Sequence, residues 1–242
     1  MPYFPYSDVE NIDCMLGMKK YPDKFFEWCV ADVPYGKNVA KMAYTQEVNT
    51  TVKQRNGKRL SIPKQKYMLK DWDTEAPSQA YIDEVRRVSK NQIIFGVEYA
   101  NWEGLGAGRI KWDKCVPYGM SFKGYEMAYC SAIEHTEEIK LLWSGMRQAK
   151  SIQQPTIQQG NKKLNEKRIH PCHKPKLLYQ MLFERFCGEN DKILDTHLGG
   201  GSSRIVAHEM GLYFKGFETD KDYFLAQEQR FLRETVNGIK QK

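Results

Sequence analysis

The chain has 242 residues, of which 41% are hydrophobic, so it can bury the core of one sizeable domain. It has no run of 18 apolar residues and its first residues lack the pattern of a signal peptide, so we expect a cytoplasmic protein with no membrane partner. The six cysteines form no C-x-x-C pair, which indicates reduced thiols, and the spacing around Cys172 is too tight for a standard zinc site, so we expect no metal.

The formal net charge is +7, and the positive charge is concentrated in two segments. Residues 36–70 carry nine lysines and arginines against a single glutamate, and residues 146–176 carry eight against a single glutamate. Two such runs in one chain are typical of a protein that binds a polyanion, and the alternative is a pair of solvated loops.

Hydrophobic patterning predicts alternating strands and helices, which indicates an α/β fold with a doubly wound, mostly parallel sheet. The predicted helices cover residues 15–20, 74–89, 176–186, 202–210 and the tail from 222. The predicted strands cover residues 24–31, 92–97, 109–113, 126–131, 193–195 and 212–217. Residues 135–145 are either a strand or a short helix, and residues 36–70 and 146–169 show little periodicity and are expected to be loops.

A glycine-rich turn lies between the last two predicted strands, with Asp195 before it and Glu218 after it. A dinucleotide-binding loop would need a glycine where Arg204 stands, and Asp195 would repel a pyrophosphate. Asp195 would instead suit an ammonium group, and Glu218 lies at the spacing of an acid that binds ribose hydroxyls. A cationic nucleoside such as S-adenosylmethionine meets these conditions, and the alternative is an ordinary βαβ turn that binds no ligand.

Another predicted strand also ends in an acid, at Asp32. In an open α/β sheet, ligands bind at the carboxyl ends of strands where the strand order reverses. We therefore expect Asp32 and Asp195 to lie in one cleft, although they are far apart in the sequence.

Three motifs resemble those of DNA amino-methyltransferases. Asp195-Thr-His-Leu-Gly-Gly-Gly-Ser202 is similar to their D-P-F-x-G-S-G-T cofactor loop, Asp32-Val-Pro-Tyr35 to their D-P-P-Y tetrapeptide, and His170-Pro-Cys-His-Lys-Pro175 to their H-P-x-x-K-P motif. The order of the motifs is that of the beta group. The resemblance implies one methyltransferase domain over residues 1–242, with the Rossmann-like S-adenosylmethionine-dependent fold in permuted order.

The resemblance also implies which residues hold the cofactor. Asp13 matches an aspartate near the adenine, although a helix cap is the alternative, and Lys174 matches a residue near the methionine carboxylate. The expected cofactor-binding residues are Asp13, Asp32, Lys174, Asp195, His197, Gly199, Gly201, Ser202 and Glu218.

The tetrapeptide Asp32, Val33, Pro34 and Tyr35 is the expected catalytic motif. The exocyclic nitrogen of adenine is a poor nucleophile because its lone pair is shared with the ring. Hydrogen bonds to the Asp32 carboxylate and the carbonyl of residue 33 would free that lone pair, and Tyr35 could stack on a flipped base. An aspartate favours adenine N6, with cytosine N4 as the second choice. Because Val33 stands where the family has proline, a degenerate module that binds without turnover stays open, as does methylation of a protein or RNA.

Residues 36–70 are expected to be a DNA-contacting loop and residues 146–169 a short target-recognition insertion, for which a linker is the alternative. Since the insertion is short, we expect a short target site in duplex DNA, or help from a partner or from a second subunit in a homodimer. The expected DNA-binding residues are Lys37, Lys41, Lys53, Arg55, Lys58, Arg59, Lys162 and Lys163.

Overall fold

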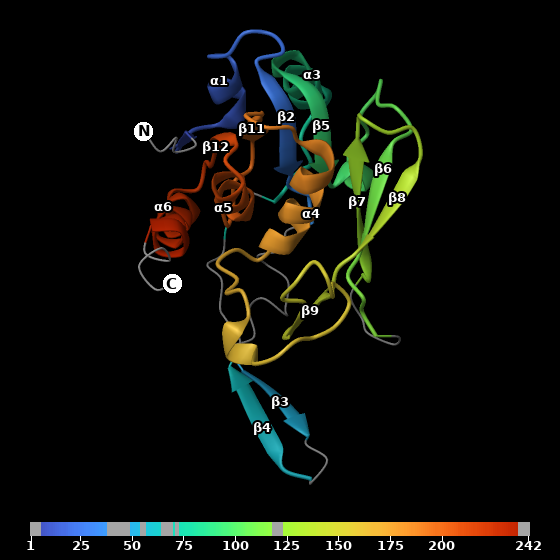
Figure 1. The fold of residues 1–242 in the computed structure, drawn as a ribbon, viewed down its shortest axis with the longest axis vertical. Helices are drawn as coiled ribbons and strands as arrows, with labels where there is room; N and C mark the ends of the chain where they lie inside the picture. The colour runs from blue at the N-terminus through green and yellow to red at the C-terminus, as the bar shows by residue number, and fades with distance from the viewer. Residues whose placement is uncertain are drawn as a thin grey trace.

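The computed structural model describes residues 6–37, 49–53, 57–63, 70, 73–117 and 123–236. Its centre is an eight-stranded sheet in the order β1-β12-β11-β2-β5-β7-β6-β8 (Figure 1). The strands are β1 (Ser7–Glu10), β2 (Phe26–Asp32), β5 (Ser89–Phe95), β6 (Arg109–Asp113), β7 (Tyr125–Cys130), β8 (Thr136–Lys140), β11 (Lys192–Asp195) and β12 (Tyr213–Phe217).

Most neighbouring strands are parallel, and only β7 runs antiparallel to its neighbours β5 and β6. The strand β2, which carries the tetrapeptide, precedes β11 in the chain but lies beside it in the sheet. The predicted α/β fold with a mostly parallel sheet in permuted order is therefore confirmed, and residues 135–145 include a strand, β8, rather than a helix.

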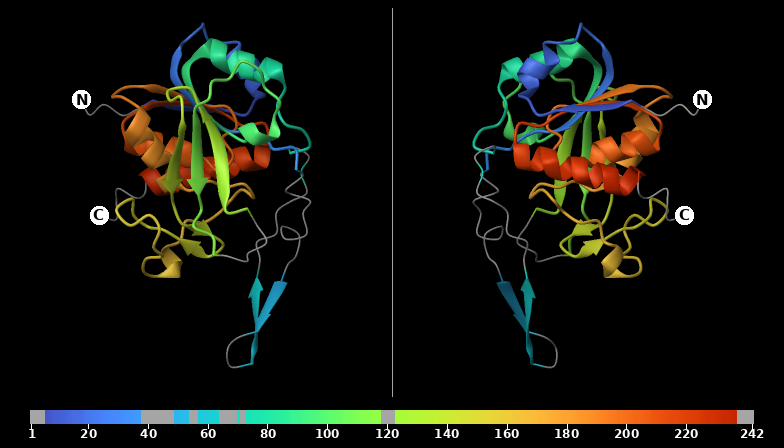
Figure 2. Two further views of the ribbon diagram at one scale, coloured as in Figure 1. Left: turned by 90° about the vertical axis from the view of Figure 1, so that its right-hand side faces the viewer. Right: turned by 90° about the vertical axis from the view of Figure 1, so that its left-hand side faces the viewer.

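Helices cover both faces of the sheet, as the two side views in Figure 2 show. The described helices are α1 (Cys14–Met18), α3 (Gln79–Val88), α4 (Lys176–Phe186), α5 (Ser202–Glu209) and α6 (Lys221–Phe231), with short 3₁₀ turns η2 (Val97–Tyr99) and η3 (Lys162–Leu164) and a π-helical turn, η4 (Leu232–Val236). In this part of the chain, no helix has the length and apolar character that a bilayer span requires.

Two apolar cores result from this layering. Leu178 and Leu182 of α4 and Val206 of α5 pack on one face of the sheet, whereas Met18 of α1 and Ile82 of α3 pack on the other. Because both faces are covered, the central strand β2 is buried along most of its length, which explains why its sequence is almost continuously apolar.

The region expected to be a basic loop contains regular structure, so this prediction was wrong in part. β3 (Asn49–Lys53) and β4 (Arg59–Pro63) form an antiparallel hairpin. The hairpin extends from the body on the side to which the carboxyl end of β2 points (Figures 1 and 2). The β-branched residues Thr50, Thr51, Val52 and Ile62 favour strands, but they are too few to give the sequence a clear alternation.

Residues 146–169 are mostly irregular, as expected, but their first residues belong to a small hairpin. There β9 (Trp143–Ser144) pairs with β10 (Arg147–Gln148). The predicted helix over 74–89 starts later, at Gln79, because Pro77 and Ser78 precede it, and Ser78 is extended. The bounds of α4 agree with the prediction.

The loop before β6 offers a test of the packing. A Cβ at Gly108 would lie 2.1 Å from the carbonyl oxygen of Ile133 and 2.2 Å from that of Cys130, whereas a Cβ at Gly106 would meet nothing within 4 Å. We expect Gly108→Ala to lower the free energy of unfolding by about 2 kcal/mol or more. The control Gly106→Ala should change it by less than about 0.5 kcal/mol. Urea denaturation measures both, and equal effects would contradict the close packing of β6 against residues 130–133.

Candidate active site

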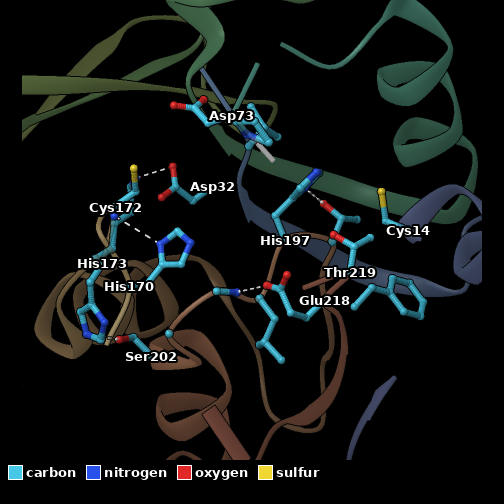
Figure 3. Close-up of a pocket in the computed structure, with 18 of the residues that line it drawn as sticks. Cys14, Asp32, Asp73, His170, Cys172, His173, His197, Ser202, Glu218 and Thr219 are labelled. Atoms are coloured by element: carbon cyan, nitrogen blue, oxygen red, sulfur yellow. Dashed lines mark hydrogen bonds and ion pairs between the residues drawn. The ribbon is translucent and has the colours of Figure 1, made fainter. Parts of the chain in front are cut away.

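The carboxyl ends of β2, β11 and β12 surround one cavity (Figure 3). β11 pairs with β2 through Ile193 opposite Trp28 and Leu194 opposite Cys29, so Asp32 and Asp195 end neighbouring strands, as the sequence predicted. The described residues that line the cavity are Asp13, Cys14, Asp32, Val33, Pro34, Tyr35, Asp73, His170, Cys172, His173, Lys174, Tyr179, Thr196, His197, Leu198, Gly199, Gly200, Ser202, Phe217, Glu218 and Thr219.

The structure brings most of the predicted cofactor residues to this cavity. Asp195 and Gly201 do not line it. The Asp195 carboxylate is buried beneath the glycine turn, where the Ser203 hydroxyl donates to it at 2.6 Å and the His197 backbone N–H at 3.0 Å. Asp195 therefore shapes the loop, and the direct ammonium contact predicted for it is not supported.

Glu218 forms the wall of the cavity at the end of β12. Its carboxylate accepts hydrogen bonds from the backbone N–H groups of Gly199, at 2.8 Å, and Asp220, at 2.9 Å. Burial raises its pKa above the usual range. Asp13 lines the cavity and also caps α1, since its carboxylate accepts from the N–H groups of Met15 and Leu16. Both interpretations of Asp13 in the sequence thus fit its position.

Asp32 belongs to a buried polar cluster formed with Tyr35, Glu126 and Lys174. The Lys174 ammonium forms an ion pair with Asp32 Oδ1, and the Tyr35 hydroxyl lies 2.9 Å from the same oxygen. Lys174 Nζ also lies 3.0 Å from Glu126 Oε2 and donates to the Tyr35 hydroxyl at 3.0 Å. Lys174 also lines the cavity, and the contact expected between it and the methionine carboxylate of a cofactor stays a prediction.

The Tyr35 ring fits into a space that a glycine provides. A Cβ at Gly96 would lie 2.5 Å from the ring, so a larger residue is excluded there. The ring also lies beside Tyr99, with centroids 4.8 Å apart and planes 35° apart. Burial raises the pKa of Tyr35 well above its usual value, so the phenol stays neutral.

Asp73 fixes the backbone that follows the tetrapeptide. Its Oδ1 accepts hydrogen bonds from the N–H groups of Tyr35, at 2.7 Å, and Gly36, at 2.9 Å. Asp73 is 2% exposed and comes from the far end of the basic segment. Asp73 therefore holds the backbone at the end of the tetrapeptide, where the basic segment begins.

A second buried ionic cluster lies behind the glycine turn, with Glu166 at its centre. The carboxylate contacts His173 Nε2 at 2.9 Å and Arg230 at 2.7 Å and accepts from the Ser202 hydroxyl at 3.2 Å. It also accepts from the backbone N–H of Lys176, the first residue of α4. Glu166 thus ties residues 146–169 to the cofactor loop, to α4 and to α6.

The pKa of the Glu166 carboxyl group is strongly lowered by its neighbours. Burial would raise its pKa, but His173 and Arg230 together lower the pKa to about 2. The pairing also explains Gly200, since a Cβ there would lie 2.4 Å from His173 Nδ1. His173 stands where the resembling family often has glutamine, and in this chain it belongs to the structural cluster as well as to the cavity wall.

Several residues of the site were not predicted as such. Glu126 lies on β7, and Lys114, which forms an ion pair with Glu126, follows β6. The sequence around Glu126 resembles the family, yet only a lone acid within an apolar strand could have indicated its role. Asp73 and His170 also line the cavity. His170 begins the H-P-x-x-K-P-like motif but was given no role of its own, and no local pattern distinguishes Asp73 from a surface residue.

The predicted DNA-binding residues lie mainly at the periphery. Lys37 is exposed, with its ammonium 3.6 Å from the centroid of Tyr99, and Lys58 and Arg59 are exposed beside the hairpin turn. Lys163 is also exposed. Lys53 is in β3 and Lys162 in η3, whereas Lys41 and Arg55 lie outside the described residues.

Gln154 and Gln159 lie in the expected target-recognition insertion, where glutamine side chains could read adenine edges, but here they are engaged with the protein. Gln159 Nε2 donates to the side-chain oxygen of Gln154 at 2.7 Å, and its own oxygen accepts from the backbone N–H of Lys150. They stabilise the loop in this structure, so their contact with bases stays a prediction.

Glu166→Gln tests the second cluster through its pH dependence. The folded-state pKa of about 2 lies below the ordinary value of 4.5, so the stabilisation by Glu166 is complete above about pH 4.5 and is lost as the pH falls through 2. We expect the substitution to lower the free energy of unfolding by about 3 kcal/mol at pH 7, with a smaller difference from the parent at pH 3. Urea titrations at both pH values measure this, with exposed Glu134→Gln as the control. The same loss at both pH values would show that Glu166 acts by shape rather than by charge.

Comparison with known proteins gives partial matches in sequence and a match of the whole fold. Type II methyltransferase M2.LlaDCHI of Lactococcus lactis subsp. cremoris is 30% identical over 70 residues, which are 29% of this chain and 26% of that protein. Type II methyltransferase M2.DpnII of Streptococcus pneumoniae is 33% identical over 61 residues, or 25% of this chain and 23% of that protein. This chain thus aligns with about a quarter of each relative's length.

Solved structures are similar in fold at low sequence identity. The M1.HpyAVI–SAM complex has a TM-score of 0.51 at 14% identity and covers 92% of this chain and 98% of its own. PvuII DNA methyltransferase, described as cytosine-N4-specific, has a TM-score of 0.55 at 12% identity and covers 97% and 90%.

The family model of the N6/N4 DNA methylases matches residues 20–229, which include all three motifs. The cavity unites those motifs at the carboxyl ends of neighbouring strands. The resemblance found in the motifs is thereby confirmed, and the chain belongs to the N6/N4 DNA methylase family.

Proposed function

We propose that this protein transfers a methyl group from S-adenosylmethionine to the N6 amine of adenine in duplex DNA, after the base has been flipped out of the helix. The observation that carries the proposal is the position of Asp32. Its partly buried carboxylate ends β2 at the cavity that also contains Glu218 and the glycine turn. A base amine and a cofactor could therefore meet in one space.

The charges around the cavity fit a cationic nucleoside. Its lining contains the carboxylates of Asp13, Asp32, Asp73 and Glu218, against the single ammonium of Lys174. Burial lowers the pKa of His170 to about 3 and that of His197 to about 4, so these imidazoles are neutral at pH 7. An excess of negative charge disfavours a pyrophosphate and favours a sulfonium or an ammonium group.

Different residues of the cavity would hold different parts of the cofactor. Glu218 would offer carboxylate oxygens to a ribose, and Asp13 and Phe217, which line the same cavity, would flank an adenine ring. Gly199 and Gly200 place backbone without side chains in the wall of the cavity. When bound, the cofactor supplies an electrophilic methyl group on a positively charged sulfur.

Asp32 would act on the amine. The nitrogen gains the methyl group and must lose one proton, so a neighbouring acceptor both aligns the amine and removes positive charge from it. Asp32 Oδ1 is already held by Lys174 and Tyr35, which fixes the carboxylate before a base arrives. The carbonyl of Val33, which also lines the cavity, is the second acceptor proposed.

The choice of adenine over cytosine rests on chemistry rather than fold. The cytosine-N4-specific PvuII enzyme has a similar fold, so the fold does not separate the two bases. The acid of the tetrapeptide favours adenine, because the family's cytosine-N4 members more often carry serine at that position. Methylation of cytosine N4 is the second candidate.

The proposal of DNA as the partner rests on where the basic segments lie. The β3–β4 hairpin and residues 146–169 both lie on the side of the molecule to which β2 points (Figure 1). Lys70 is different, because it forms ion pairs with Asp220, at 2.8 Å, and Asp222, at 2.5 Å. It anchors the basic segment to the start of α6 and does not join the phosphate-binding set.

Product analysis tests the reaction. We expect purified protein, labelled S-adenosylmethionine and mixed-sequence duplex DNA to yield N6-methyladenine, detected by mass spectrometry after digestion to nucleosides. Asp32→Asn should reduce turnover by about 100-fold or more. The matched control Asp83→Asn, on the exposed side of α3, should leave it unchanged.

Each other outcome identifies a different alternative. Only N4-methylcytosine would refute adenine as the substrate, and label only in RNA or protein would refute DNA. A parent protein that binds S-adenosylmethionine in calorimetry but forms no product with any of these would support the degenerate binding module.

Salt dependence tests the hairpin as a DNA contact. If Lys58 and Arg59 each neutralise a phosphate, Lys58→Gln/Arg59→Gln should weaken duplex binding and reduce the slope of log affinity against log salt by about 2. Lys19→Gln/Lys90→Gln removes the same charge near α1 and the start of β5, away from the hairpin, and should leave the slope unchanged. Fluorescence anisotropy between 50 and 200 mM salt measures both slopes, and equal changes in the two variants would refute a specific hairpin contact.

A further inference from the structure

Lys174 is shared between two partly buried carboxylates, of which Asp32 lines the cavity and Glu126 does not. Its ammonium pairs with Asp32 Oδ1 and lies 3.0 Å from Glu126 Oε2, and its side chain is 4% exposed. The Tyr35 hydroxyl forms a second bridge, since it lies 2.9 Å from Asp32 Oδ1 and 3.1 Å from Glu126 Oε2. The two acids are therefore joined by a cation and by a neutral phenol.

Glu126 lies to the side of Asp32, two strands along the sheet. It lies on β7, which is separated from β2 by β5, and it is absent from the cavity lining. Lys114, in the turn after β6, forms an ion pair with Glu126 Oε1. Glu126 thus contacts two ammonium groups and lies outside the lining of the cavity.

We propose that Glu126 is a positioning residue that sets the basicity of Asp32 by holding Lys174 between the two carboxylates. This inference rests on the proposed methylation of an amine at Asp32. Without Glu126, the Lys174 charge would fall on Asp32 alone and make it a weaker acceptor for the amine protons. Without Lys174, two buried acids would share one site, and one of them would be protonated.

The remaining charged groups around the pair act in the directions that this arrangement requires. Burial raises the pKa of Asp32, Lys174 opposes that effect, and Glu126 adds to it. Burial acts in the same direction on Glu126, but Lys174 and Lys114 outweigh it and lower the pKa of Glu126 to about 2. Glu126 is therefore the acid that stays ionised, and Asp32 is the one whose proton affinity can change.

Other titratable groups face Asp32 as well. The Cys172 thiol lies beside the Asp32 carboxylate (Figure 3), and burial, followed by the charge of Asp32, raises its pKa, so it stays neutral. Asp195 and Asp32 also interact electrostatically. Asp73 is linked to Asp32 only indirectly, because it accepts a hydrogen bond from the backbone N–H of Tyr35. Among the described residues, Lys174 and the Tyr35 hydroxyl each contact both carboxylates of the pair, and of these two Lys174 carries the charge.

The first experiment measures Asp32 directly, without turnover. Carbon-13 NMR of protein labelled at the aspartate carboxyl carbons follows the titration of Asp32, whose signal is assigned by Asp32→Asn. Glu126→Gln should move this titration to lower pH, because all of the Lys174 charge then acts on Asp32. Lys114→Gln should move it to higher pH, because Glu126 then attracts Lys174 more strongly and a cation is lost.

The matched control is Glu138→Gln, which removes the same charge from the exposed ion pair of β8 with Lys111. It should leave the Asp32 titration unchanged. In a Lys174→Gln background, Glu126→Gln should shift the titration less than it does in the parent, since the two residues act through each other.

The second experiment reads the effect on catalysis. In Glu126→Gln, kcat at pH 7.5 should fall about tenfold, and the acid limb of the pH–rate profile should move to lower pH. Affinity for S-adenosylmethionine should stay within about threefold of the parent, and Glu126→Asp, which keeps the charge, should restore the profile. If Glu126 had a purely structural role, Glu126→Gln would lower activity at every pH and leave the acid limb of the pH–rate profile unchanged.

The outcomes separate this inference from the proposed function. If Asp32 titrates alike in the parent, Glu126→Gln and Lys114→Gln, the inference is overturned whether or not the protein is active. If the titrations shift in opposite directions but the parent methylates nothing, the electrostatic arrangement stands and the proposed reaction fails. Should Glu126→Gln fail to fold, Lys114→Gln still decides, since an unchanged titration in that variant overturns the inference.

Discussion

The parallel pairing of β11 with β2 is the constraint on which the site depends. Asp32 and the glycine turn come from opposite ends of the chain, and only this pairing brings them to one edge of the sheet. A slip by one residue would turn each side chain of β11 to the other face, so Asp195 could no longer hold the turn through Ser203 and His197. The chemistry of the site follows from this register.

Two buried ionic clusters flank the cavity, and their energetic cost indicates what they are for. Removing charged groups from water costs several kcal/mol for each ion, and apolar residues of similar volume would often stabilise a fold as well. The chain nevertheless places Lys174 between two acids and Arg230 on Glu166, and in each cluster a glycine leaves room for a ring, Gly96 for Tyr35 and Gly200 for His173. Clusters of this kind fix side-chain positions closely, which a reaction between a cofactor and a base requires. The two clusters act on different parts of the site. One holds Asp32, and the other holds the glycine turn through Ser202.

Local patterns in the sequence predicted most strands of the central sheet and the helices on it, but not the partners of each side chain. The apolar spacing of α4 gave its bounds, and the three motifs gave the cavity, because both signals lie within short stretches of the chain. The role of Glu126 depends on the order β2-β5-β7, which no local pattern contains. The ion pair of Lys174 and the burial of Asp195 beneath its own loop are likewise properties of the assembled sheet. The β3–β4 hairpin was missed for a different reason, since its short strands carry too little alternation to stand out from a basic segment.

The replacement of the first proline of the tetrapeptide by Val33 can be weighed in the same physical terms. A proline stabilises a compatible turn by about 0.4–1 kcal/mol, chiefly by restricting the unfolded chain. In this structure Asp73 accepts two backbone hydrogen bonds, from Tyr35 and Gly36, and a bond to a charged acceptor contributes about 1.5–3 kcal/mol. Val33 is itself 2% exposed, which restricts it further. Because the contribution of Asp73 exceeds that of the missing ring, the tetrapeptide can keep its shape without the proline, and Val33 gives little reason to regard the site as degenerate.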